Sequence, residues 1–264
     1  MEIRYKLPRQ TFSSEEKQKW MNNIFGIYKE MKEKSKRGSY EINFNGIDII
    51  VFPDVYAPQF FSDSKWFSKE LPKIIGKKSL LEIGTGTGII GISCALKGAK
   101  VVLTDINSEA AKNAVTNVKK QNLSISVRIG NIYGPLKKNE KFDFIFWSHP
   151  YNNSDKPIED MLMRSGFDHN YKGLKSYIRK AKNYLTPQGK LLLGTGSTAD
   201  LKTIKKVADE AGYFIRILKK SEMYLGFDKK DKITNMIVQF IPKEKLNLTS
   251  DRVFCTACKT MNKS

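Results

Sequence analysis

A glycine-rich turn between a buried strand and a helix constrains the fold more than any other feature of the sequence. Residues 84–91 read Gly-Thr-Gly-Thr-Gly-Ile-Ile-Gly and directly follow the run Leu80-Leu81-Glu82-Ile83. Alternating glycines carry an entropic cost that packing alone rarely needs, and they allow a ligand to approach the backbone above the carboxyl ends of strands. The turn therefore predicts an α/β sheet that binds a ligand.

Strands and helices alternate on both sides of this turn. Helical stripes separate apolar runs at about 80–83, 101–104, 125–129, 142–147 and 191–193, and two further strands are expected near 214–218 and 233–241. This alternation is typical of a parallel sheet covered on both faces. The last two strands have no clear helix between them, which indicates that one of them is antiparallel. We predict a seven-stranded, mostly parallel α/β sheet with helices on both faces.

The residues before this pattern predict a small annex. Ser13 begins a capping box for a helix over about 13–35, and Asn45-Gly46 separates two apolar runs as in a β-hairpin. We therefore divide the chain into a helix-and-hairpin annex at 1–52, the main α/β domain at 53–242 and a basic polar tail at 243–264.

The charge balance of the chain favours a polyanionic partner. Its 264 residues include 46 Lys and Arg against 27 Asp and Glu, which gives a formal net charge of +19. Nucleic acid is the first candidate and an anionic membrane face the second, although a lysine-rich proteome gives the same balance. No apolar run of membrane-spanning length and no signal-peptide core is present, so we expect a cytoplasmic protein without a membrane segment.

Few residues are suited to bind metal or form disulfides. The chain has three cysteines and two histidines, which excludes a disulfide framework and a histidine-based metal cluster. Cys255 and Cys258 form one C-x-x-C pair without a second pair, and Cys94 is expected inside a helix. We predict no metal site.

Two cofactors fit the glycine turn. Gly86, Gly88 and Gly91 spell the dinucleotide fingerprint, and Asp105 follows Gly86 by 19 residues. S-adenosylmethionine is the competitor, because Glu82 places a carboxylate where an ammonium and a sulfonium benefit and a pyrophosphate does not. The turn alone leaves both open.

The rest of the chain resembles class I S-adenosylmethionine-dependent methyltransferases of the HemK/PrmC-like amino-methyltransferase type, over about residues 50–241. Glu82–Gly88 looks like their first motif, and Asp105 matches their ribose-binding acid. Asn131 stands where the family has the acid that holds the adenine amine. The resemblance implies a Rossmann-like methyltransferase sheet and S-adenosyl-L-methionine as cofactor. It implies this set of binding residues: Tyr56, Asp63, Glu82, Gly84, Thr85, Gly86, Gly88, Asp105, Ile106, Asn131, Ile132 and Ser148.

The segment Ser148-His149-Pro150-Tyr151 resembles the (Asn/Asp/Ser)-Pro-Pro-Tyr motif of the same enzymes. Their motif holds both N–H groups of a planar amine and stacks an aromatic ring on it. The resemblance implies that the Ser148 side chain and the His149 carbonyl accept these N–H groups and that Tyr151 stacks. His149 replaces a proline, and its side chain can accept a proton, contact a phosphate or simply pack among neighbours.

Four functions follow from these features. The first is N-methylation of a planar amino group in an rRNA or tRNA base, with Phe60, Phe61, Trp147 and Tyr151 available for stacking, although Phe60 and Phe61 also fit a core. The second is glutamine methylation on a ribosome-associated protein, as in HemK/PrmC-type enzymes. The third is a catalytically inactive RNA-binding relative. The fourth, a nicotinamide oxidoreductase, leaves the segment 148–151 without a role.

Overall fold

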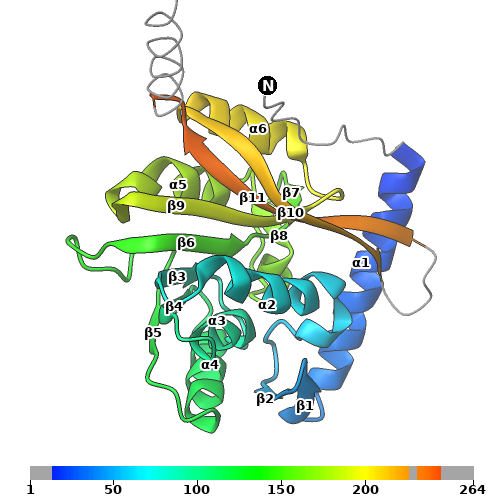
Figure 1. Ribbon diagram of the computed structural model, residues 1–264. Coiled ribbons are helices and arrows are strands. Elements are labelled where there is room, and N and C mark those ends of the chain that lie inside the picture. Colours follow the sequence, from blue (N-terminus) through cyan, green and yellow to red (C-terminus); the bar gives the residue numbers. More distant parts are fainter. Residues whose placement is uncertain (1–13, 226–230, 245–264) are drawn as a thin grey trace, which may run out of the picture.

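The computed structural model describes residues 14–225 and 231–244, and a seven-stranded sheet forms their centre (Figure 1). Its strand order is β10-β11-β9-β6-β3-β4-β5. The strands are β3 (Ser79–Ile83), β4 (Lys100–Asp105), β5 (Ser126–Ile129), β6 (Phe142–Ser148), β9 (Leu185–Gly196), β10 (Tyr213–Leu225) and β11 (Asp231–Pro242). β11 runs antiparallel to both of its neighbours, and the other pairs are parallel. The predicted α/β sheet with one antiparallel strand is confirmed.

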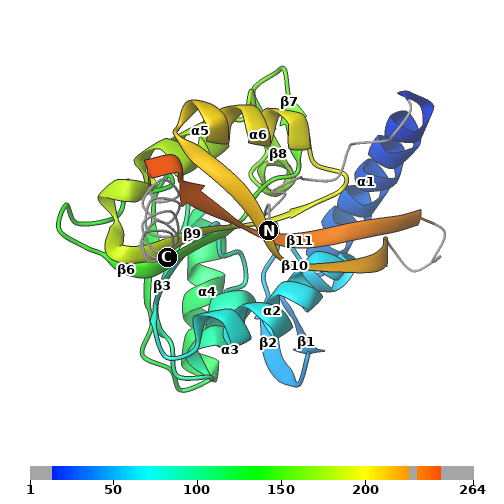
Figure 2. The same cartoon turned by 45° about the horizontal axis from the view of Figure 1, so that its top comes forward.

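Helices cover both faces of the sheet (Figures 1 and 2). One face carries α2 (Ser62–Ile75), α3 (Ile89–Ala95) and α4 (Ser108–Lys120), and the other carries α5 (Lys172–Lys180) and α6 (Leu201–Glu210). Alternate residues of a strand point to opposite faces. Leu81 and Ile83 accordingly belong to the buried cluster under α5 and α6, and Leu80 belongs to the cluster under α2 and α3. These two apolar layers explain why the inner strands read as continuous hydrophobic runs.

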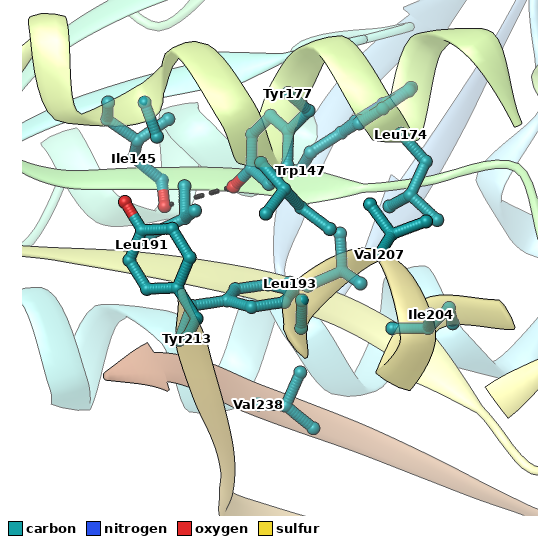
Figure 3. Packing of buried hydrophobic residues seen from close by; sticks show 14 of the residues in the cluster. Ile145, Trp147, Leu174, Tyr177, Leu191, Leu193, Ile204, Val207, Tyr213 and Val238 are labelled. Carbon is teal, nitrogen blue, oxygen red and sulfur yellow. Dashed lines mark hydrogen bonds between the residues drawn. The ribbon is translucent and has the colours of Figure 1, made fainter. Parts of the chain in front are cut away.

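The cluster under α5 and α6 fixes the end of β6. Tyr177 of α5 is fully buried, and its hydroxyl donates to the Ile145 carbonyl at 3.2 Å (Figure 3). The Trp147 ring packs against the Tyr177 ring with 5.4 Å between centroids. The strand that leads into residues 148–151 is therefore held by a layer of buried apolar and aromatic side chains.

The annex consists of α1 (Ser14–Ser35) and a hairpin of β1 (Tyr40–Phe44) and β2 (Ile47–Val51). Both predictions are confirmed, whereas the expected N-cap Ser13 lies outside the described residues. The hairpin turn places Asn45 and Gly46 at φ of 55° and 84°, as a type I′ turn requires. Asn117 of α4 accepts from the Ile50 backbone N–H at 2.8 Å, which joins the hairpin to the sheet domain. The domain boundaries at residues 52 and 242 stay predictions.

The structure adds one unit and corrects one turn. β7 (Asn152–Ser154) and β8 (Phe167–His169) form a small parallel pair beyond β6, which sequence patterns did not indicate. The sequence Thr-Pro-Gln-Gly at residues 186–189 predicts a turn before the strand expected at 191–193, but β9 already begins at Leu185. The pairing with β6 is irregular there, and a Cβ on Gly189 would lie 2.8 Å from the Phe142 carbonyl oxygen. The glycine thus allows an irregular strand to continue where we expected a turn.

Three smaller predictions concern metals, membranes and cysteines. Cys94 is buried in α3, as expected, whereas Cys255 and Cys258 lie outside the described residues. Within residues 14–225 and 231–244 no three His, Cys, Asp or Glu side chains are grouped to hold a metal ion. Over the same ranges no helix has the length and apolar character needed to cross a bilayer.

Candidate functional site

A pocket lies at the carboxyl ends of β3, β4 and β6, where ligands bind in open α/β sheets. Its floor includes the glycine turn after β3 and the segment 148–151 after β6. Trp20, Ile24 and Tyr28 of α1 line it from the annex side. The pocket therefore unites the two motifs that the sequence singled out.

The glycine turn is shaped by close contacts. Gly84 and Gly86 have φ of 62° and 56°, in the left-handed region. A Cβ on Gly84 would lie 2.6 Å from Nε1 of Trp147. Only glycine fits at residue 84, and the backbone there is open toward the pocket.

Glu82 stands directly beneath this turn. Its carboxylate accepts a hydrogen bond from the Thr85 hydroxyl at 2.9 Å. Burial raises the pKa of Glu82 to about 8, which outweighs the opposing effect of the Thr85 hydrogen bond. A cation placed near this carboxylate would favour its ionised form.

Asp105, at the end of β4, connects two turns. Its carboxylate accepts from the Gly86 N–H and from the Asn107 N–H, each at 2.9 Å. Burial raises the pKa of Asp105, and these backbone donors oppose the rise.

On the annex side, the Tyr56 hydroxyl donates to the Asp63 carboxylate at 3.3 Å, and burial raises the pKa of both groups.

A second pocket adjoins the first. Arg164, Gly84, Ile106, Trp147 and Pro150 line both pockets. The predicted binding residues divide between them. Tyr56, Asp63, Glu82, Gly84, Thr85, Gly86, Asp105, Ile106 and Ser148 line the first, and Gly84, Ile106, Asn131 and Ile132 line the second.

Gly88 differs from the other predicted binding residues. It lines neither pocket and forms the N-cap of α3 with φ of 83°, where an added Cβ would lie 3.2 Å from Cβ of Ala114. Its part is to let α3 pack closely against α4. The third glycine of the motif is therefore explained by helix packing.

His149 is buried next to the segment's aromatic rings. Its Nε2 lies 3.0 Å from the Thr195 hydroxyl, and rings of Trp147, Tyr151 and Tyr171 surround it at 5.5 to 6.2 Å. Burial lowers the pKa of His149 to about 3, so the imidazole is neutral at working pH. Of the three roles left open by the sequence, this environment favours packing among neighbours.

Tyr151 is held from two sides. Its carbonyl accepts from the Tyr171 hydroxyl at 2.6 Å. A Cβ on Gly196 would lie 2.9 Å from Cε2 of Tyr151, so the ring rests against the backbone of β9. Burial and the charge of Asp63 raise the pKa of Tyr151. The phenol stays neutral and its ring is fixed in the pocket.

The pocket gathers polar atoms that have no hydrogen-bond partner. Among the described residues, eight buried side-chain nitrogen or oxygen atoms lack one, and six of them belong to residues that line this pocket. These six are Trp20 Nε1, Ser62 Oγ, His149 Nδ1, the Tyr151 hydroxyl, Thr198 Oγ1 and Asn235 Oδ1. Buried polar groups are normally paired, so such a cluster indicates a site completed by a polar ligand.

Sequence reasoning missed several lining residues and left one pair open. Arg164, Thr198 and Asn235 come from segments far from either motif, and no local pattern marks them.

The pair Phe60 and Phe61 divides between the two roles considered for it, core packing and stacking in the pocket. Phe60 is buried in the cluster beneath α1, and Phe61 lines the pocket and stacks on Tyr56 with 5.1 Å between centroids.

Comparisons with known proteins agree with this geometry. The family model described as "Methyltransferase small domain" matches residues 48–224. A Methanocaldococcus jannaschii protein named as a protein N5-glutamine methyltransferase is 36% identical over 173 residues, which cover 63% of this chain and 85% of that protein. The ribosomal RNA small subunit methyltransferase C of Photobacterium profundum is 27% identical over 164 residues, which cover 60% of this chain and 44% of that protein.

A solved structure shows the same fold. The crystal structure of a methyltransferase from Pyrococcus furiosus superposes with a TM-score of 0.55 at 21% identity, covering 83% of this chain and 98% of that one. The chain spans less than half of the P. profundum relative but most of the M. jannaschii relative.

Proposed function

Because the chain belongs to the methyltransferase small-domain family and is an S-adenosylmethionine-dependent enzyme, we propose that it methylates a planar amino nitrogen of a base in ribosomal or transfer RNA. One observation carries the proposal. The segment 148–151 lies in the same pocket as Glu82 and Asp105, so a held amine and a bound cofactor share one space. The nicotinamide oxidoreductase alternative is wrong, because the methyltransferase family model matches residues 48–224, which include the glycine turn.

The pocket fits the cofactor chemically. Asp105 offers a carboxylate at the end of β4 to a pair of ribose hydroxyls, and Glu82 offers one to a cationic group. Six buried polar atoms of residues that line this pocket have no hydrogen-bond partner among the described residues, which favours a polar ligand there. When bound, S-adenosylmethionine supplies an electrophilic methyl group on a sulfonium.

The chain's own residues orient the acceptor. A planar amine is a poor nucleophile because its lone pair is delocalised. The Ser148 side chain and the His149 carbonyl accept its two N–H groups, and the Tyr151 ring supports the plane, which directs the lone pair. The neutral His149 imidazole does not serve as the base, since its pKa is about 3. Catalysis then rests on positioning and electrostatics.

Charge and aromatic side chains favour RNA as the acceptor. The net charge of +19 supplies the attraction to phosphates that nucleic-acid binding requires. Phe61, Tyr151 and Trp147 all line the pocket, but the Trp147 ring is only 7% exposed and packs against Tyr177, so Phe61 and Tyr151 are better placed to stack a base. The stacking partners we propose are therefore Phe61 and Tyr151.

A glutamine amide is the second candidate. It presents the same planar nitrogen, and the relative named for glutamine methylation is covered over 85% of its length. A ribosome-associated protein would then be the partner. No feature of the described pocket favours the inactive RNA-binding alternative, because the segment 148–151 is in place beside the glycine turn.

Transfer of tritium from labelled S-adenosylmethionine tests the proposal. The purified protein is incubated with unmodified rRNA and tRNA transcripts and, separately, with ribosomal proteins. We expect label in RNA that nuclease releases, and a methylated base by mass spectrometry of nucleosides. Label only in protein supports the second candidate. Bound cofactor without transfer to either acceptor contradicts the proposed function, and the variant Tyr151→Ala gives the background level.

A further inference from the structure

We propose that eight exposed lysines at the amino ends of β3, β4, β6 and β9 form a second contact surface, which binds the phosphate backbone of a folded RNA at the end of the sheet opposite the pocket. We call these lysines the amino-end surface. The inference rests on the proposed function, because it takes RNA as the methyl acceptor. It adds where the RNA backbone is held and how far the RNA must extend.

The charge of the pocket does not account for attraction to RNA. The charged residues that line the first pocket are Asp63, Glu82, Asp105 and Arg164. Three acids beside one arginine suit a cationic cofactor and do not attract phosphates. The excess of lysines must therefore act elsewhere on the molecule for RNA to be bound.

Four lysines of the amino-end surface lie at the starts of β3 and β4. They are Lys77, Lys78, Lys97 and Lys100, and all four are exposed. The Lys100 backbone N–H donates to the Lys78 carbonyl at 3.1 Å, and a Cβ on Gly98 would lie 3.3 Å from Cγ of Lys77. These contacts bring the connections before the two strands side by side.

The other four lysines lie before β6 and β9. They are Lys137, Lys138, Lys141 and Lys182, and they are exposed as well. The Lys141 ammonium donates to the Asn183 carbonyl at 2.7 Å, which joins these two connections. Lys141 and Lys100 also line one further pocket, so the two groups of lysines adjoin. The eight lysines therefore form one surface.

Few negative charges oppose these lysines. None of the eight forms an ion pair within residues 14–225 and 231–244. Two acids lie beside them and already bond other groups. Glu140 accepts from both terminal nitrogens of the Arg128 guanidinium, and Asp143 accepts from the Ser79 N–H and hydroxyl. The lysine ammonium groups are thus available to an external anion.

Helix dipoles explain only part of the amino-end surface. Lysines close to the last turn of a helix stabilise its C-terminus, and Lys77, Lys78 and Lys97 follow α2 and α3 closely. Lys100, however, begins β4, and residues 130–141 between β5 and β6 contain no helix. The lysines at 137, 138 and 141 therefore have no helix end to stabilise, and a bound anion is the better reason for their gathering.

The distance from the pocket sets the size of the partner. Lys141 precedes β6 and Ser148 ends it, so they lie at opposite ends of one strand, about 20 Å apart. β6 and β9 begin on the side of the sheet that faces away from α1, which lines the pocket (Figure 1). An RNA with a base beside Tyr151 and phosphates on the amino-end surface must span at least this length. A folded RNA does so, and a fragment of a few nucleotides does not.

Binding of a labelled RNA duplex of about 20 base pairs tests the surface without methyl transfer. The surface variant carries Lys78→Gln, Lys100→Gln, Lys138→Gln and Lys182→Gln, one lysine at the start of each strand. We expect the dissociation constant to rise at least about tenfold at physiological salt. The slope of log Kd against log salt concentration should fall by about one for each lysine that contacts a phosphate.

A matched control removes the same charge elsewhere. It carries Lys69→Gln, Lys202→Gln, Lys206→Gln and Lys220→Gln, on α2, α6 and β10, and these lysines are exposed and line neither of the two site pockets. The duplex should bind this variant within about threefold of the parent, because salt screens charges that make no contact. Equal weakening in both variants, or none in the surface variant, overturns the proposal. Thermal melts and cofactor affinity equal to the parent verify that both variants are folded.

Polyglutamate of equal total charge separates RNA from an acidic protein as the partner. We expect it to bind more weakly than the duplex, because charges lie about 1.7 Å apart along a nucleic-acid duplex and about 3.3 Å apart along an extended chain. Polyglutamate that binds as tightly as the duplex, and loses the same affinity in the surface variant, indicates an acidic protein partner and overturns the assignment to RNA.

Methyl transfer shows whether the surface serves the acceptor. On the rRNA or tRNA transcript that takes up label, the surface variant should raise KM at least about tenfold and keep kcat within about twofold, because the pocket is untouched. On a fragment of about six nucleotides around the methylated base, any transfer should be equal for parent and variant, because the fragment does not reach the lysines. An unchanged KM on the full transcript overturns the proposal.

The inference and the proposed function fail separately. Duplex binding that depends on the amino-end surface, without methyl transfer to any acceptor, contradicts the proposed function and leaves the surface. Methylation of an RNA base with a KM that the surface variant does not change contradicts the surface and leaves the proposed function.

Discussion

The two halves of the pocket are built in different ways. The donor half, at the glycine turn, is built from residues that lie close together in the sequence or on adjacent strands. Its carboxylates already accept hydrogen bonds: Asp105 from the N–H groups of Gly86 and Asn107, and Glu82 from the Thr85 hydroxyl. The half around Tyr151 uses side chains from β6, the β9–α6 connection and β11. Its Thr198 Oγ1 and Asn235 Oδ1 have no hydrogen-bond partner within residues 14–225 and 231–244. The first half is preorganised by local sequence, and we propose that the methyl acceptor completes the second.

The largest expected effect belongs to the acceptor half. Tyr151→Ala removes the stacking ring, and we expect kcat to fall about 100-fold or more, since misplacing a reactant by about 1 Å has that cost. The dissociation constant of the cofactor should stay within about twofold, because Asp105 and Glu82 are untouched. Single-turnover kinetics and calorimetry measure the two quantities.

A conservative change at the same residue isolates the ring. Tyr151→Phe keeps the stacking face and removes only the hydroxyl, so it should retain most of the parent turnover. An equal loss in both variants would show that the hydroxyl, beside Asp63, and not the ring, supports the reaction.

The next effect belongs to the donor half and has the opposite signature. Asp105→Ala should weaken cofactor binding about 10- to 100-fold, because hydrogen bonds to a charged group contribute about 1.5–3 kcal/mol. Turnover at saturating cofactor should change less. Asp143→Ala is the matched control. Asp143 accepts from the Ser79 N–H and hydroxyl at 3.0 and 2.8 Å, outside both pockets. Cofactor binding that is equally weak in both variants would contradict the assignment of Asp105.

How far the sequence predicts each half follows from this difference. The sheet, its antiparallel strand and the donor half could be predicted, because glycines, a strand-end acid and apolar runs are local signals. Gly88 is predicted to bind the cofactor, but it lines neither pocket and lies close to Ala114, because a one-dimensional motif does not separate the two uses of a glycine. Asn235 gave no signal. Its place in the pocket depends on the pairing of β11 with β9, which only the tertiary structure sets.

The same limit applies to His149. Its side chain could be placed on a loop by sequence but not among three aromatic rings. The neutral imidazole results from burial, which brings together residues from β6, β9 and the segment before α5. The environment of His149, and not its residue type, favours packing among its three possible roles.

A separate effect, on folding and not on catalysis, concerns the dependence of stability on pH. Burial holds the pKa of Glu82 at about 8 in the folded chain, above the usual value of 4.5. The folded state then keeps a proton that the unfolded state releases, so this contribution to stability is present below about pH 4.5 and is lost as pH rises through about 8. Glu82→Gln should nearly match the parent at pH 5 and exceed it by several kcal/mol at pH 9 without cofactor, because each unit of pKa difference contributes about 1.4 kcal/mol. Thermal melts measure the difference.

Glu140 gives the opposite trend and serves as the control. Arg128 bonds both of its oxygens, at 2.6 and 2.7 Å, and holds the pKa of Glu140 at about 2. Its contribution to stability is present above about pH 4.5 and is lost as pH falls through 2.

A melting difference for Glu82→Gln that does not grow between pH 5 and pH 9 would show that the Glu82 carboxylate is better solvated than its buried position implies.

The smallest effect tests whether α1 serves both halves of the pocket. Lys32 of α1 pairs with Asp160, and both side chains are more than a third exposed. Because exposed ion pairs contribute about 0–1 kcal/mol, Lys32→Ala should lower the melting temperature by no more than a few degrees. Tyr28 is buried and its hydroxyl bonds that of Ser165 at 2.9 Å, so Tyr28→Phe should have the larger effect of the two. If α1 covers only the acceptor half, both variants should raise KM for RNA and leave the dissociation constant of the cofactor unchanged. An equal change in both constants would show that α1 covers the donor half as well.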